Sequence, residues 1–137
     1  MALSNGSSGY QYSSGNVNEV LLANQATEVT KSAAATLTAA ELINGIISYT
    51  GAAANLTLPA ASDLDVSTSS YSAPVASARA NSCFDFSVIN TGSGTATIAL
   101  GSGWTAVGSL AVLTTEKAGG FRCRKSSDGV WYLYRIA

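Results

Sequence analysis

The amino-acid sequence predicts an all-β fold: a single β-sandwich or barrel-like domain with one or two short helical turns and an extended N-terminal arm. Short apolar segments recur about every 8–12 residues in the second half of the chain, and glycine-containing turns separate them. In one of these segments Phe84, Phe86 and Val88 alternate with polar residues, as in a half-buried strand. Helix signals are confined to two short segments before residue 66.

The chain of 137 residues suits one compact domain, which we expect to span residues 35–137. Residues 1–34 differ from it, because serine- and glycine-rich runs at 4–9 and 13–16 separate a few short apolar segments. These segments contain too few apolar side chains to form a core of their own. An ordered arm must therefore lie on another surface, either its own β-body or a neighbouring subunit.

The first part of the domain contains one clear helix signal and two strand signals. Thr38 and Glu41 have the spacing of a capping box, and Gly45 ends the helix soon after it begins. Residues 46–50 and 54–58 then predict two strands, because β-branched and apolar residues dominate both.

The rest of the domain is expected to be β-structure after one more helical turn at 60–65 and a serine-rich loop at 66–81. Glycine-containing turns at 90–94, 101–103 and 127–129 each predict a hairpin. The expected strands cover residues 84–90, 95–100, 104–107, 110–113, 121–125 and 130–136.

The final strand, residues 130–136, is apolar on both faces. Trp131 and Leu133 share one face, and Tyr134 lies on the other with further apolar side chains. An exposed strand on a small monomer normally has one polar face. The strand is therefore either central and covered within one subunit, or it faces another subunit. In the second case we expect Trp131, Leu133 and Tyr134 at the subunit interface.

Composition argues against several functions. Seven basic and eight acidic residues give a net charge of −1, which opposes nucleic-acid binding through a positive field. No apolar run approaches the roughly 18 residues of a membrane helix, and no signal peptide is recognisable, so we expect synthesis in a cytoplasm and no membrane partner. Because the chain has no histidine, we expect no catalytic residues, metal site or cofactor. Cys83 and Cys123 are expected to fill core space without a required disulfide.

Two groups of charged residues are candidate sites. Asp63 and Asp65 could bind calcium weakly, but a solvated helix end is favoured because the remaining ligand pattern is absent. Arg122 and Arg124 share one face of a strand whose other face is apolar. They form either a patch for an acidic partner or a solvated strand face that blocks aggregation, and the second interpretation is favoured.

Five segments carry a family resemblance: 35–47 (ATLTAAELINGII), 54–59 (ANLTLP), 83–91 (CFDFSVINT), 99–103 (ALGSG) and 131–135 (WYLYR). Taken together they resemble small structural proteins of tailed bacteriophages, the capsid decoration (cement) proteins. The resemblance covers about residues 35–137. It implies a virion protein, a homotrimer that binds the major capsid protein on the outside of the phage head.

The N-terminal arm lies outside this resemblance. Main-chain hydrogen bonds could add its extended pieces to a sheet edge of a shell protein, with apolar side chains as anchors. The expected capsid contacts are Tyr10, Tyr12, Val20, Leu21 and Leu22. The alternative function is a trimeric tail, fibre or baseplate component that binds a host glycan. In that case exposed aromatic residues such as Trp104 or Tyr71 would stack on sugar rings.

Overall fold

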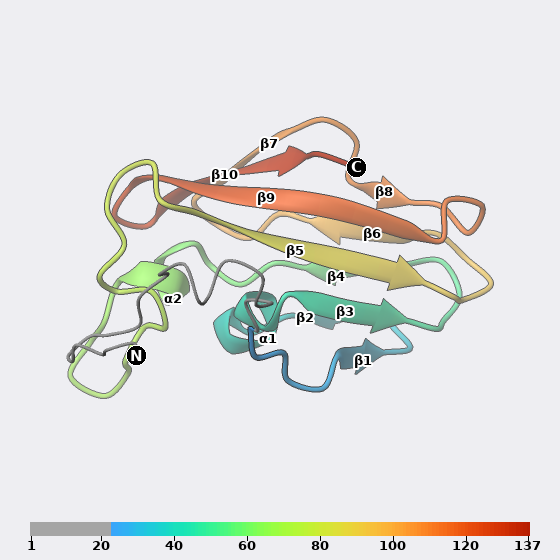
Figure 1. Ribbon diagram of the computed structural model, residues 1–137, viewed down its shortest axis with the longest axis horizontal. Helices are drawn as coiled ribbons and strands as arrows, with labels where there is room; N and C mark the ends of the chain where they lie inside the picture. Colours follow the sequence, from blue (N-terminus) through green and yellow to red (C-terminus); the bar gives the residue numbers. More distant parts are fainter. Residues whose placement is uncertain (1–22) are drawn as a thin grey trace, which may run out of the picture.

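The computed structural model describes residues 23–137, which form two β-sheets and two short helices (Figure 1). The six-stranded sheet contains, in spatial order, β1 (Val29–Lys31), β3 (Ile46–Tyr49), β5 (Cys83–Asn90), β9 (Ala118–Ser127), β10 (Val130–Arg135) and β7 (Trp104–Val107). The four-stranded sheet contains β2 (Ala35–Thr36), β4 (Ala54–Thr57), β6 (Ala96–Ala99) and β8 (Ala111–Val112). The helices are α1 (Ala39–Asn44) and α2 (Ser62–Asp65).

The first six strands alternate between the two sheets. Strands β1, β3 and β5 are parallel neighbours in the larger sheet, and β2, β4 and β6 are parallel neighbours in the smaller one. Each of the pairs β1–β2, β3–β4 and β5–β6 therefore forms one turn of a parallel winding. Figure 1 shows β1, β3 and β5 side by side and pointing in the same direction.

The connections that cross from the larger to the smaller sheet stack directly on one another. The amide of Thr50 donates to the carbonyl of Lys31 at 3.0 Å, and the amide of Ser93 donates to the carbonyl of Gly51 at 3.0 Å. A Cβ atom added to Gly92 would lie 2.2 Å from the carbonyl oxygen of Gly51. Glycine is therefore required here because the backbones of successive turns touch.

The local structure of α1 confirms the predicted capping box. The Thr38 hydroxyl accepts from the Glu41 amide at 3.1 Å, and the Glu41 carboxylate accepts from the Thr38 amide at 3.0 Å. Gly45 ends the helix in the left-handed conformation at φ 90°, with its amide donating to Leu42. This short helix leads the chain from β2 in the smaller sheet to β3 in the larger one.

Of the three predicted hairpins, only the one at residues 127–129 is confirmed, since it joins the antiparallel strands β9 and β10. The predictions at 90–94 and 101–103 are wrong. The first segment carries the chain from β5 in the larger sheet to β6 in the smaller sheet, and the second returns it to β7 in the larger sheet. A glycine-rich turn between strands thus has the same local signature whether it folds back within a sheet or crosses to another sheet.

Side chains from both sheets meet in one buried cluster. Within it, the rings of Phe86 and Phe121 stack at a centroid distance of 5.2 Å, and those of Trp104 and Trp131 lie 6.2 Å apart. The smaller sheet and its connections add mainly aliphatic side chains, namely Leu37, Leu56, Leu58, Leu64, Ile98 and Val112. The prediction of a β-rich fold with two short helical segments is confirmed.

The body of the fold begins earlier than residue 35. Val29–Lys31 forms β1 and pairs with β3, and the Gln25 side chain donates to the Asn44 carbonyl at 2.9 Å. The predicted boundary between arm and domain at residue 34 is therefore too late. The sequence indicates a short extended segment at 26–31, but its few apolar residues did not show that it pairs with the body of the fold instead of belonging to the arm.

Candidate functional site

The outer surface of β9 carries two arginines, as the sequence predicts. Phe121 and Cys123 are buried in the core, whereas the side chains of Arg122 and Arg124 point away from it. This alternation follows from the pleat of a strand, in which successive side chains lie on opposite faces.

Neighbouring strands place two tyrosines and one aspartate beside these arginines. In the register of the larger sheet, Tyr132 lies opposite Arg124, Tyr134 lies opposite Arg122, and Asp85 of β5 lies opposite Arg122 from the other side. We call these five residues the tyrosine–arginine face. It spans β5, β9 and β10, which lie side by side in Figure 1.

The guanidinium of Arg124 is held by aromatic and polar contacts. Its carbon atom lies 4.9 Å from the centre of the Tyr132 ring, and Nε donates to the Tyr134 hydroxyl at 3.0 Å. Nη1 donates to the side-chain oxygen of Asn81 at 2.9 Å. Among the described residues Arg124 has no carboxylate partner. Its positive charge therefore remains available on the surface.

Arg122, by contrast, is paired within the chain. It forms a bidentate ion pair with Asp85, with N–O distances of 2.7 and 2.8 Å, and both side chains are about half exposed. The hydrogen bond from Arg122 lowers the pKa of Asp85, and the same bond raises the pKa of Arg122. Of the two arginines considered for an acidic-partner patch, Arg122 is neutralised by Asp85 and Arg124 has no carboxylate partner among the described residues.

The structure corrects two of the predicted interface residues. Trp131 is 1% exposed and Leu133 is not exposed at all, and both belong to the core of their own subunit. Their side chains cannot contact a second subunit, because β9 and β7 flank β10 in the sheet and the core covers its inner face. Tyr134 lies on the outer face and remains a candidate. The predicted arm contacts Tyr10, Tyr12, Val20, Leu21 and Leu22 lie outside the described residues.

A buried ion pair joins α2 to the β9–β10 hairpin, and sequence reasoning missed it. The Lys125 ammonium lies 2.9 Å from the Asp65 carboxylate, and their side chains are 4% and 0% exposed. Asp65 also accepts from the indole of Trp131 at 3.1 Å and from the amide of Gly129. The interpretation of Asp65 as a solvated helix end is therefore wrong.

Lys125 has a second carboxylate partner at the protein surface. Asp128, whose side chain is 83% exposed, lies 2.7 Å from the Lys125 ammonium, which also donates to the carbonyl of Ala78. The hydrogen bonds to Asp128 and Asp65 raise the pKa of Lys125. Every hydrogen of the ammonium thus has a partner, which is the condition for burying a charge.

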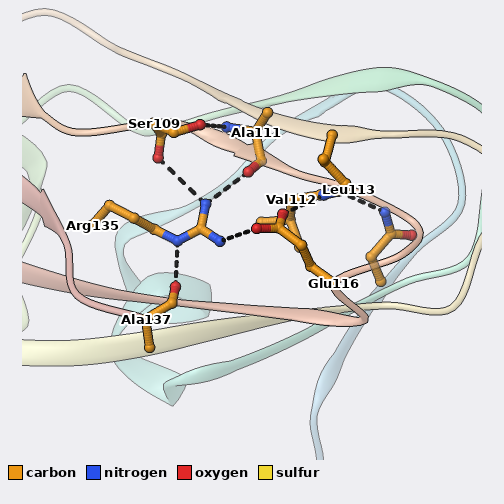
Figure 2. Close-up of polar contacts among 8 residues, drawn as sticks. Ser109, Ala111, Val112, Leu113, Glu116, Arg135 and Ala137 are labelled. Carbon is orange, nitrogen blue, oxygen red and sulfur yellow. Dashed lines mark hydrogen bonds and ion pairs between the residues drawn. The ribbon is translucent and has the colours of Figure 1, made fainter.

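Arg135 performs a similar role at the opposite end of the sheet (Figure 2). Its guanidinium donates to the carbonyl of Ala111 in β8 at 2.7 Å and pairs with Glu116 at 3.2 Å. A further bond reaches the carbonyl of Ala137, and the group lies 5.2 Å from the centre of the Phe121 ring. Since β8 forms only a two-residue pairing with β6, Arg135 ties this short strand to the larger sheet.

The remaining candidate residues are the two cysteines and Trp104. Cys123 fills core space as predicted, and burial raises the pKa of its thiol. The same prediction is wrong for Cys83, which is exposed on the outer face of the sheet because its side chain alternates away from the core. The two thiols therefore point to opposite faces. Trp104, proposed for sugar stacking, is 7% exposed and donates its indole hydrogen to the carbonyl of Pro59, so its ring is unavailable.

Residues 23–137 contain no cluster of three or more His, Cys, Asp or Glu side chains that could hold a metal ion. Within the same range, no helix is long and apolar enough to cross a membrane. The chain matches no family model, and comparisons with curated proteins and with solved structures found no similar protein. What the geometry offers is recognition chemistry: stacked aromatic rings and one unneutralised cation on a rigid sheet.

Proposed function

We propose that this protein is a structural component of a bacteriophage virion, which decorates and stabilises the outer surface of the capsid as a homotrimer bound to the major capsid protein. The observation that carries the proposal is the tyrosine–arginine face, whose composition is typical of protein contacts. The resemblance of residues 35–137 to capsid decoration proteins supplies the kind of assembly. We further propose that the two sheets form a β-sandwich, since they share one core.

The composition and rigidity of this face support a role in subunit contact. Tyrosine and arginine are enriched among the residues that dominate binding energy at protein interfaces. The rings of Tyr132 and Tyr134 stack at 6.2 Å and Arg124 packs against both, so these side chains lose little further entropy on binding. Val107, opposite Tyr134, and Ile136 beyond it are 51% and 50% exposed, and they extend the apolar area.

A cyclic trimer joins two different surfaces of adjacent subunits. The tyrosine–arginine face therefore meets a second surface of the next subunit, and the charge of Arg124 favours an acidic one. We assign the arm to contact with the capsid and not with the trimer, because its expected anchor residues come before the folded body in the sequence.

The trimer is tested by removing the two tyrosine rings of the face. We expect the wild-type protein to sediment as a trimer at micromolar concentration, and the double variant Tyr132→Ser/Tyr134→Ser to sediment as a monomer with an unchanged circular dichroism spectrum. Tyr71→Ser is the control, because Tyr71 is a surface tyrosine that lies outside the tyrosine–arginine face. A monomeric wild-type protein would refute the trimer. A trimeric double variant would refute the assigned face.

Capsid binding is tested separately with purified phage heads that lack tails and lack this protein. The full chain should bind them, whereas a chain without residues 1–22 should remain a trimer and lose binding. This deletion leaves β1 in place, which a deletion reaching residue 30 would not. Binding to tails or to host cells but not to tailless heads would instead support the alternative, a tail or fibre protein.

A further inference from the structure

A cleft of about 490 Å³ lies between the start of α1 and the region of α2. Residues 36–39 form one side, and Pro59, Ala60, Asp63 and Tyr71 complete the lining. Its volume falls in the range of small-molecule sites, about 300–1,000 Å³. The cleft is separate from the tyrosine–arginine face, because none of its lining residues belongs to β5, β9 or β10.

The Tyr71 ring is fixed in position although its side chain is largely exposed. Its hydroxyl donates to the backbone carbonyl of Asp63 at 2.7 Å, and its backbone pairs with Thr68 through an isolated β-bridge. The ring is 41% exposed and lines the cleft. An aromatic ring held open in this way is a stacking surface that needs no ordering when a ligand binds.

The polar groups of the cleft suit hydroxyl groups and oppose anions. Neither the carboxylate of Asp63 nor the hydroxyl of Thr36 has a hydrogen-bond partner in the described part of the chain. The hydroxyl of Thr38 is already used in the capping box. No basic side chain lines the cleft, so Asp63 would repel a phosphate or carboxylate ligand.

The floor of the cleft is apolar. Leu37 is 1% exposed and Ala39 is 3% exposed, and Pro59 is buried beside them. A ligand for this site therefore needs an apolar face for the accessible Tyr71 ring and hydroxyl donors for the Asp63 carboxylate. A neutral sugar ring combines both, since its C–H groups form an apolar face and its hydroxyls lie around the edge.

We propose that this cleft binds a short neutral saccharide, with Tyr71 stacking on a sugar ring, Asp63 accepting hydroxyl hydrogen bonds, and Thr36 providing a further polar contact. The site goes beyond capsid decoration and does not depend on the trimer. With one aromatic ring and one carboxylate, we expect a dissociation constant of about 1 mM.

The experiment is a titration of the isotope-labelled full chain by NMR, with cellobiose and maltose as neutral disaccharides and glucose 6-phosphate as the anionic probe. We expect at least one neutral disaccharide to shift the amide signals of residues 36–39, Asp63 and Tyr71, and glucose 6-phosphate to leave them unchanged. Tyr71→Ala should weaken binding at least tenfold. Asp63→Asn keeps the side-chain shape without the charge and should weaken binding several-fold.

Leu113→Ala is the control, because it shortens an exposed apolar side chain outside both the cleft and the tyrosine–arginine face and should leave saccharide binding unchanged. Unchanged amide spectra away from the substituted residue establish that each variant is folded. The proposal is overturned if neither disaccharide shifts the cleft signals, or if Tyr71→Ala binds as tightly as the wild type. Equal binding of glucose 6-phosphate would also overturn it. A wild-type protein that is monomeric but binds the saccharide would refute only the proposed trimer and leave the saccharide site standing.

Discussion

The winding formed by β1–β6 and the strands β7–β10 are stabilised in different ways. In the winding, successive turns touch through their backbones, and Gly51 and Gly92 stand where any side chain would collide. In the later strands, charged side chains make long-range ties: Lys125 reaches α2, and Arg135 reaches β8. The contacts between turns of the winding therefore depend on the absence of side chains at Gly51 and Gly92, whereas the contacts of the later strands with α2 and β8 depend on the charged side chains of Lys125 and Arg135.

The largest effect is expected from filling the contact between turns in the winding. Gly92→Val places a branched side chain where a Cβ atom already lies 2.2 Å from the Gly51 carbonyl oxygen. The backbone must move, because neither partner is a flexible side chain. We expect a loss of about 4 kcal/mol in the free energy of unfolding, or no folded protein. Urea unfolding followed by circular dichroism measures it.

Ala52→Val is the control for this change. It places the same valine side chain at an exposed position in the adjacent turn and should alter stability by less than about 0.5 kcal/mol. If Gly92→Val were tolerated as well as Ala52→Val, the stacking of turns would not be a main source of stability in the winding.

The second largest effect is expected from breaking the buried ion pair that joins β9 to α2. Lys125→Met leaves the carboxylate of Asp65 buried without its cation, which should cost about 3 kcal/mol. Asp128→Asn removes only the exposed partner of Lys125 and should cost less than about 1 kcal/mol. If both variants lost the same free energy of unfolding, the buried pair with Asp65 would not contribute more to stability than the exposed pair with Asp128.

The pH dependence of this tie follows from the raised pKa of Lys125. Its contribution is fully present below the pKa of an unfolded lysine, about 10.4, and is lost as the pH rises through the higher pKa of the folded state. Wild-type stability should therefore fall in strongly alkaline solution. The fall should be smaller in Lys125→Met.

The sequence predicted local features of the fold and missed the partners that lie far apart. The capping box at Thr38 and the hairpin at residues 127–129 depend on a few adjacent residues, and both are confirmed. The crossings at 90–94 and 101–103 look like hairpins locally, but the choice of partner strand depends on the whole winding. This is why parallel pairing was not foreseen.

The same distinction applies to the candidate sites. The shared face of Arg122 and Arg124 follows from strand alternation and was predicted correctly. Asp65 comes just before the serine-rich loop at 66–81, and Lys125 comes long after it in the sequence. Nothing in the local sequence around either residue therefore indicates that they pair. A buried Lys is rare, so the one available signal was its place on the inward side of an otherwise apolar face, after Phe121 and Cys123.

The smallest effect is expected where the two regions meet on the surface. Asp85 in β5 belongs to the winding and Arg122 in β9 belongs to the later strands, and their ion pair is about half exposed on each side. Water and salt screen such a pair, so Asp85→Asn should change the urea midpoint at neutral pH by little more than the error of measurement. Because the folded pKa of Asp85 is lowered, its small contribution is present above the ordinary aspartate pKa and is lost as the pH falls through the folded value. The wild type and Asp85→Asn should therefore converge fully in acid, and they should also converge at high salt at neutral pH. If Asp85→Asn lowered the free energy of unfolding as much as Lys125→Met, the pairing of β5 with β9 would depend on this ion pair. It would then not rest on the main-chain hydrogen bonds between the strands and the core beneath them.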